Sequence, residues 1–172
     1  MPKKKVIFLD FDGVLNTERH QLALRLGGWR RQDEYGPLFD PEAVENLRAV
    51  LSAVPEALIV VNSSWKLEGM DWILELWSAR DLPGKVYGVT PDYVPDLLNI
   101  DLDDYDNIVM LAGKGNEVKQ WIAEHAPGGC HYVIFDDMPD FLPEQEEHLI
   151  RTDPYVGITA ENAAAAIQIL TE

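Results

Sequence analysis

The feature that most constrains the fold is an apolar run near the N-terminus that ends in two acids. Residues 6–9, Val-Ile-Phe-Leu, lack the alternation of a half-exposed strand, so they predict a parallel strand buried on both faces. Asp10 and Asp12 follow its carboxyl end, and Gly13 permits a tight turn or a close approach to a ligand. Because burial of unpaired carboxylates is costly, we expect a compensating cation such as Mg²⁺, which prefers oxygen ligands. The alternative is a strand that ends in a solvated acidic turn.

Strands and helices alternate along the rest of the chain. Further strands are expected at residues 57–61, 85–89, 131–135 and 148–153, and helices at 41–54, 70–77, 114–125 and 160–170. Asp40 and Thr159 are suitable caps for the first and last of these helices. This alternation predicts one α/β domain over residues 1–172, a doubly wound, Rossmann-like parallel sheet of about five strands.

Two long segments interrupt this alternation. Residues 16–39 have weak periodicity and directly follow the acidic pair, so we expect a flap or small cap there. Arg25 and Arg30 belong to a group of arginines in this segment, and arginine binds anionic groups in bidentate geometry. Either residue could equally well only solvate the segment. Residues 92–112 contain several aspartates without the spacing of a calcium loop, and we expect a solvated acidic loop.

Polar residues also follow the other predicted strands. Ser63 and Ser64 follow the strand at 57–61, and the acids Asp136, Asp137 and Asp140 follow the strand at 131–135. Lys114 stands at a predicted helix N-terminus, where a cation is disfavoured unless an anion is nearby. Since the carboxyl ends of parallel strands meet at one edge of a sheet, these residues and the first acidic pair are expected to form one site.

Composition limits the partners and the location of the chain. The 172 residues include 30 acids and 14 bases, a net charge of -16, which disfavours nucleic acid and anionic membrane as partners. No apolar run has membrane-spanning length and no signal peptide is recognisable, so a cytoplasmic location is expected. The single cysteine excludes an internal disulfide and a thiolate metal site.

Residues 10–15, Asp-Phe-Asp-Gly-Val-Leu, resemble the first signature of the haloacid dehalogenase superfamily of aspartate-dependent Mg²⁺ phosphohydrolases. The strand that ends at Ser63, the pair Lys114-Gly115 and residues 135–137 are similar to its second, third and fourth signatures. The turn at residues 62–66 is similar to members related to nucleic-acid-repair phosphatases. The resemblance implies a Rossmann-like domain with a small cap.

The resemblance also implies roles for these residues. Asp10 would be the nucleophile that forms an aspartyl-phosphate, and Asp12 would protonate the leaving group and then deprotonate water. Ser63 would donate a hydrogen bond to the phosphoryl group, with Ser64 as the alternative, and Lys114 would neutralise its charge. The Mg²⁺ ligands would be Asp10, the backbone carbonyl of Asp12, Asp136 and Asp137, with Asp140 as an alternative ligand. The candidate substrate-binding residues are Gly13, Arg25, Arg30 and Ser64.

Three functions agree with this sequence. The first is a phosphatase for a small phosphorylated metabolite or nucleotide. The second is a nucleic-acid end phosphatase of the repair type, which the turn at residues 62–66 favours and the net charge disfavours. The third is a domain that binds Mg²⁺, phosphate or a protein partner without turnover.

Overall fold

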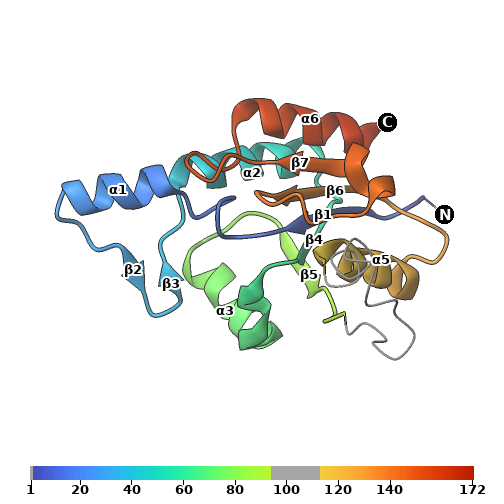
Figure 1. Ribbon diagram of the computed structural model, residues 1–172, viewed down its shortest axis with the longest axis horizontal. Coiled ribbons are helices and arrows are strands. Elements are labelled where there is room, and N and C mark those ends of the chain that lie inside the picture. Colours follow the sequence, from blue (N-terminus) through green and yellow to red (C-terminus); the bar gives the residue numbers. More distant parts are fainter. Residues whose placement is uncertain (1, 94–112) are drawn as a thin grey trace, which may run out of the picture.

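Five parallel strands form the central sheet of the protein (Figure 1). The computed structural model describes residues 2–93 and 113–172. The strands are β1 (Lys5–Leu9), β4 (Leu58–Val61), β5 (Lys85–Val89), β6 (His131–Asp136) and β7 (Leu149–Arg151), in the order β5-β4-β1-β6-β7. Residues 6–9 are completely buried in the middle of the sheet, which confirms the prediction for the first strand. Most of the acidic segment 92–112 lies outside the described residues.

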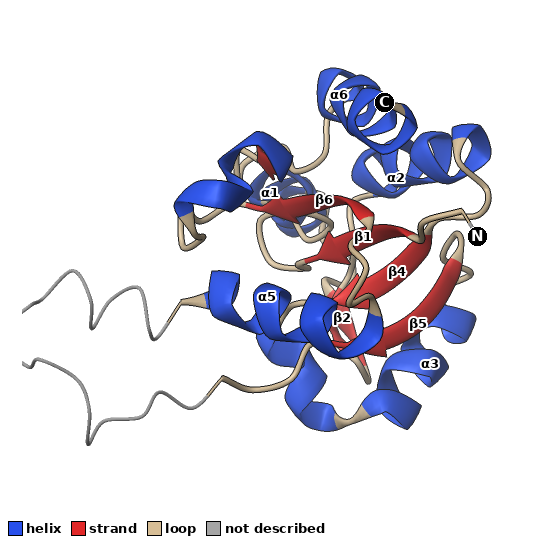
Figure 2. Cartoon of the chain, turned by 90° about the vertical axis from the view of Figure 1, so that its right-hand side faces the viewer, coloured by secondary structure: helices blue, strands red, loops and turns tan. Residues whose placement is uncertain are grey.

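Helices cover both faces of the sheet, as Figure 2 shows. They are α2 (Pro41–Ala53), α3 (Met70–Ala79), α5 (Lys114–His125) and α6 (Ala160–Thr171). Because side chains alternate along a strand, Ile7 and Leu9 of β1 join the core with α2, α3 and α6. Val6 and Phe8 point to the opposite face, where they pack with Trp121 of α5. The predicted doubly wound α/β fold is therefore confirmed.

The caps predicted for the first and last long helices are both present. The Asp40 side chain accepts a hydrogen bond of 2.9 Å from the Glu42 N–H at the start of α2. The Thr159 side chain accepts one of 3.1 Å from Asn162, whose side chain bonds the Thr159 N–H in return. Strand β7 is shorter than predicted at both ends, because His148 ends the 3₁₀ helix η2 (Pro143–His148) and Asp153 forms an isolated bridge with Gly157 instead of extending the strand.

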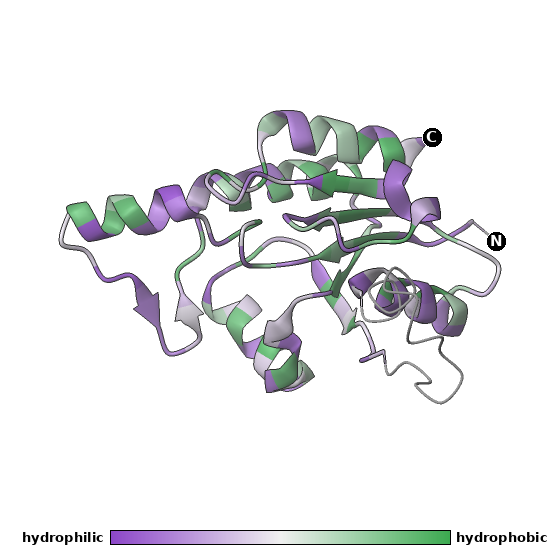
Figure 3. Ribbon diagram, viewed as in Figure 1, coloured by the Kyte–Doolittle hydropathy of each residue, from purple (hydrophilic) through white to green (hydrophobic). Residues whose placement is uncertain are grey.

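Residues 16–39 protrude from one end of the sheet (Figure 1). They contain α1 (Glu18–Leu26) and a hairpin of β2 (Gln32–Asp33) and β3 (Gly36–Pro37), elements that the sequence pattern did not predict. No residue of α1 is buried, so this helix has no apolar stripe that could have revealed it. Figure 3 shows the contrast, with apolar strands in the central sheet and a hydrophilic β2.

The two stems of this protruding segment are joined at Asp40. Its carboxylate accepts hydrogen bonds from the Thr17 hydroxyl (2.7 Å) and from Arg19 (2.9 Å), while it also caps α2. Thr17 itself caps α1 by accepting a bond from the His20 N–H. One buried carboxylate therefore ties the start of the segment to the helix that follows it. In the described residues, no helix has the length and apolar character needed to cross a membrane.

Candidate active site

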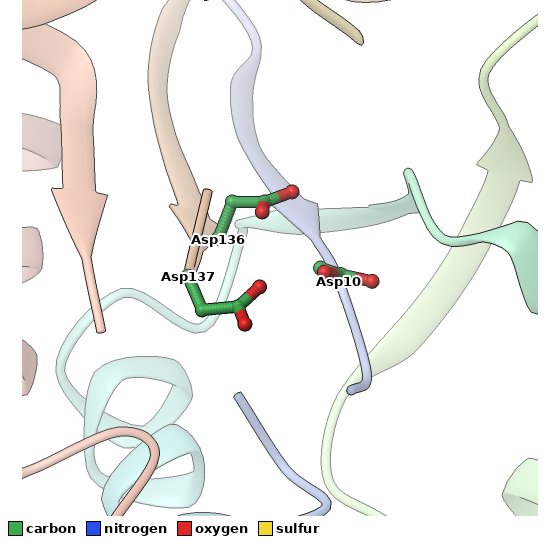
Figure 4. A group of neighbouring side chains, drawn as sticks. All are labelled: Asp10, Asp136 and Asp137. Carbon is green, nitrogen blue, oxygen red and sulfur yellow. The ribbon is translucent and has the colours of Figure 1, made fainter. Parts of the chain in front are cut away.

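Three carboxylates gather beyond the ends of two neighbouring strands (Figure 4). Asp10 follows β1 and Asp136 is the last residue of β6, and the two strands are paired with Leu9 opposite Phe135. The Asp10 N–H extends this ladder by donating to the Phe135 carbonyl at 3.1 Å. Oxygen atoms of Asp10, Asp136 and Asp137 all lie within 4.8 Å of one another. Pairing of the strands therefore brings together acids that are more than 120 residues apart in the sequence.

Lys114 completes this cluster from the first turn of α5. Its ammonium lies 3.1 Å from the carboxylate of Asp10 and 2.8 Å from that of Asp136. The sequence predicted an anion near this lysine, and two carboxylates are there. The lysine and the helix N-terminus both contribute positive potential, which offsets part of the negative charge of these carboxylates.

Burial makes two acids of the cluster, Asp10 and Asp136, hard to ionise. Asp136 is 0 % exposed, and its burial together with the charge of Asp10 raises its pKa to about 7. Burial also raises the pKa of Asp10, although the Lys114 ammonium and a hydrogen bond from the Phe11 N–H oppose this shift. Burial opposes ionisation of Lys114 as well, but the two carboxylates outweigh it and raise the lysine pKa. When its three carboxylates are ionised, the cluster has more negative charge than Lys114 alone can neutralise.

This excess charge and the chemistry of the donors fit a divalent metal ion. The three carboxylates supply only oxygen ligands, and one ammonium faces them. Gly13 makes the place of Asp137 possible, because its φ is +77° and a Cβ there would lie 2.6 Å from the Asp137 Cγ. The Asp10, Asp136 and Asp137 triad could thus bind a divalent metal, and a side chain at Gly13 would displace one ligand.

Asp12 lies apart from this triad. Its exposed carboxylate accepts hydrogen bonds from the Asn16 side-chain amide (2.9 Å) and from the Trp65 indole N–H (3.1 Å). Asp12 also lines two cavities, one of about 650 Å³ and one of about 320 Å³ that reaches Asp137. The two aspartates of the first signature therefore face different surroundings, one a buried charged cluster and the other open cavities.

The two candidate serines are not equivalent. Ser63 is 2 % exposed, and its hydroxyl oxygen accepts the Trp65 N–H at 3.2 Å at the start of η1 (Ser64–Glu68). Since a hydroxyl can donate as well as accept, Ser63 keeps a proton for a ligand. Ser64 is exposed and lines the cavity of about 650 Å³. Asp140, the alternative metal ligand, is exposed and is not part of the triad found in the described residues.

The two arginines proposed as substrate ligands are not brought to this cluster. Arg25 is exposed in the last turn of α1, and Arg30 is exposed with its Nε–H bonded to the Gln32 carbonyl at 2.6 Å. Neither belongs to the described lining of the two cavities at Asp12. The reason is that α1 and the following turn carry them out onto the protruding segment.

Trp65 lies at the site, although the sequence pattern did not predict a functional role for it. Its indole binds Asp12 and lies 5.3 Å from the Phe11 ring, measured between centroids, so it packs directly behind the acidic pair. The signal was the turn at residues 62–66, which contains Trp65 and follows a strand end. A tryptophan that packs and also donates a hydrogen bond cannot be told from a purely structural one by spacing alone.

A doubly wound parallel sheet with an acidic pair after its central strand, and a lysine and further acids at neighbouring ends, defines a haloacid dehalogenase-type domain. The particular family follows from a match of residues 6–163 to the family described as "HAD domain in Swiss Army Knife RNA repair proteins", and the chain belongs to this family. No curated protein and no solved structure gives a significant match. The family supports a phosphatase-type hydrolase function.

Proposed function

We propose that the protein is a Mg²⁺-dependent phosphatase that removes a terminal phosphate from RNA. The observation that carries the proposal is the buried cluster of Asp10, Asp136, Asp137 and Lys114 at one edge of the sheet. The description of the family, which names RNA repair proteins, supports the choice of substrate.

In the first step, Asp10 and Asp12 act on opposite sides of the phosphorus atom. A carboxylate oxygen of Asp10 attacks phosphorus while the bond to the leaving oxygen breaks, and protonated Asp12 gives its proton to that oxygen. In the second step, the Asp12 carboxylate takes a proton from water, whose oxygen attacks the aspartyl-phosphate. The bond between phosphorus and Asp10 breaks, and inorganic phosphate leaves. The different surroundings of the two aspartates support this division of roles.

Other groups hold the phosphoryl oxygens. The Lys114 ammonium offsets their charge, and the Ser63 hydroxyl donates a hydrogen bond. Asp10, Asp136, Asp137 and the backbone carbonyl of Asp12 would hold Mg²⁺. When bound, this ion supplies the positive charge that reduces repulsion between the carboxylates and the phosphate.

A second candidate is a phosphatase for a free nucleotide or another small phosphorylated metabolite. The net charge of -16 favours it, because a long polyanion is repelled by an acidic protein. Salt dependence separates the two candidates. Screening of this repulsion by salt accelerates the reaction of an oligonucleotide more than that of a mononucleotide.

The test compares phosphate release from RNA oligonucleotides with a 5′- or 3′-terminal phosphate and from the matching mononucleotides, with Mg²⁺ and with excess chelator. We expect turnover only with the metal, and loss of at least about 10⁴-fold in Asp10→Asn, because the nucleophile is removed. Asp81→Asn is the matched control, since Asp81 is exposed and its φ of +50° suits asparagine. Full activity in chelator, or in Asp10→Asn, would refute the proposal.

A further inference from the structure

A cavity of about 650 Å³ lies next to the phosphoryl site and is mostly unused by the mechanism above. Its walls come from the β2–β3 hairpin, from η1 and from α3, and Asp12 lines it as well. This volume falls within the range of pockets that bind small organic ligands. Since Asp12 is the proposed proton donor to the leaving oxygen, the cavity lies where the leaving group would be.

Three aromatic side chains line this cavity. Tyr35 of the hairpin turn lies 5.5 Å from Trp72 of α3, and Trp72 lies 6.1 Å from Trp65, measured between ring centroids. All three are only partly buried, so part of their ring surface remains accessible. A Cβ added to Gly36 would lie 3.3 Å from the Trp65 ring, so the hairpin backbone rests on this indole. The cavity therefore has aromatic surface on which a flat ring can stack.

The charged groups of the lining are acidic. Asp12, Glu34 and Glu68 contribute carboxylates, and neither glutamate has an ion pair within the described residues. The fourth acid, Asp33, is neutralised by Arg80 at 2.7 Å. No lysine or arginine belongs to the lining in residues 2–93 and 113–172. The cavity thus offers hydrogen-bond acceptors to a ligand and repels phosphate.

We propose that this cavity binds the base of the leaving nucleotide and prefers bases with an exocyclic amino group. The inference rests on the proposed phosphatase function, because the cavity is assigned to the leaving group through Asp12, the proposed proton donor. The base stacks on the aromatic side chains, and its amino group donates to the carboxylates of Glu34 and Glu68. A small aliphatic ammonium would satisfy the same carboxylates but would leave most of the cavity unfilled, so it is an outcome of the test. The nucleotide can be free or at an RNA end.

The experiment measures kcat/KM for GMP, AMP, CMP, UMP, ribose 5-phosphate and phosphocholine. We expect the amino-bearing nucleotides to react at least about tenfold faster than ribose 5-phosphate, and UMP to fall between them. We expect Trp72→Ala to lower the ratio of kcat/KM for GMP to kcat/KM for ribose 5-phosphate by roughly tenfold. Trp29→Ala, at an exposed tryptophan outside the cavity, is the control and leaves this ratio unchanged. The double variant Glu34→Met/Glu68→Met is expected to reduce the difference in kcat/KM between CMP and UMP, because the acceptors for the amino group are removed. Tyr35→Leu repeats the test if Trp72→Ala lowers the melting temperature.

Three kinetic results would overturn the inference: equal kcat/KM values with and without a base, a preference for phosphocholine, or a GMP to ribose 5-phosphate ratio that Trp72→Ala and Tyr35→Leu do not change. Oligonucleotides that differ only in the terminal base distinguish an RNA end from a free nucleotide. Saturation-transfer NMR, which detects binding of guanosine to the protein without any turnover, separates this inference from the proposed function. If no phosphomonoester is hydrolysed, the proposed function fails, whereas guanosine contact that is lost in Trp72→Ala still supports the cavity. Absence of guanosine contact refutes the base assignment.

Discussion

The buried cluster of Asp10, Asp136, Asp137 and Lys114 and the aromatic cavity that Asp12 lines are built in different ways. Strand pairing sets the cluster, since the main-chain ladder between β1 and β6 places Asp10 beside Asp136. The cavity is set by side chains that join a protruding hairpin to α3. The proposed chemistry therefore depends on the topology of the sheet, whereas the proposed recognition of the leaving group depends on side-chain contacts outside the sheet.

Arg80 is the main connection between the hairpin and α3. Its guanidinium donates to both carboxylate oxygens of Asp33, at 2.7 and 3.0 Å, and to the carbonyls of Gly36 and Pro37, both at 3.0 Å. The guanidinium also lies 4.5 Å from the centre of the Phe39 ring. The hydrogen bond from Arg80 lowers the pKa of Asp33, although burial of the acid opposes this. One side chain therefore holds the cavity wall in place.

The largest effect after loss of the nucleophile is expected for Lys114→Met, which breaks the cluster and spares the cavity. We expect kcat/KM to fall by about 100- to 1000-fold for every phosphomonoester, because stabilisation of charge on the phosphoryl group is lost. The preference for nucleotides over ribose 5-phosphate is expected to stay. Lys119→Met is the control on the same helix, since Lys119 is exposed and lies 3.9 Å from the carboxylate of the exposed Glu144. A change in substrate preference in Lys114→Met would contradict the separation of the two regions.

A smaller loss of activity is expected for Arg80→Met. This substitution disturbs the cavity and leaves the cluster intact, the reverse of Lys114→Met. Loss of the paired hydrogen bonds to Asp33 is expected to lower the free energy of unfolding by about 2 kcal/mol. The nucleotide preference falls because the hairpin is no longer held, while turnover of ribose 5-phosphate stays within about threefold. Denaturant unfolding measures the change in stability, and kcat/KM for GMP and for ribose 5-phosphate measures the change in preference. Arg48→Met, at a more exposed arginine on α2, is the control, and equal effects of the two substitutions would argue against the role of Arg80.

The sequence predicted the cluster because its signals are local. An apolar run identifies β1, and each acid or lysine of the cluster lies at the carboxyl end of a strand, directly after one, or at the start of a helix. Parallel pairing then places all of these ends at one edge, so no side-chain geometry was needed. The buried strands and the capped helices could be read for the same reason, since their apolar periodicity is strong.

The cavity could not be predicted because its signals are not local. Trp65 and Trp72 read as core residues, and Tyr35 lies in a segment without periodicity. Helix α1 buries no residue, so no apolar stripe marks it, and β2 and β3 have two residues each. The contact between Asp33 and Arg80 spans 47 positions and depends on how the hairpin folds back onto α3. Such a contact leaves no trace in the spacing of a single sequence.

The smallest expected effect concerns Asp40, which joins the stems of the protruding segment. Burial raises the pKa of its carboxyl, but hydrogen bonds from Thr17, Arg19 and the Glu42 N–H outweigh burial and bring the pKa below the ordinary value of 3.8. A lowered pKa means that the ionised form stabilises the fold, so this stability is present above pH 3.8 and is lost as the pH falls through the folded-state pKa. Asp40→Asn can keep the helix cap to the Glu42 N–H, but it removes the charge and the second acceptor oxygen to which Thr17 and Arg19 donate.

We therefore expect Asp40→Asn to lower the free energy of unfolding by about 1 kcal/mol at pH 6 and by less at pH 3, relative to the wild type. Asp71→Asn, at an exposed acid in the first turn of α3, is the matched control. A difference between Asp40→Asn and the wild type that is the same at both pH values would mean that shape, and not charge, holds the two stems together.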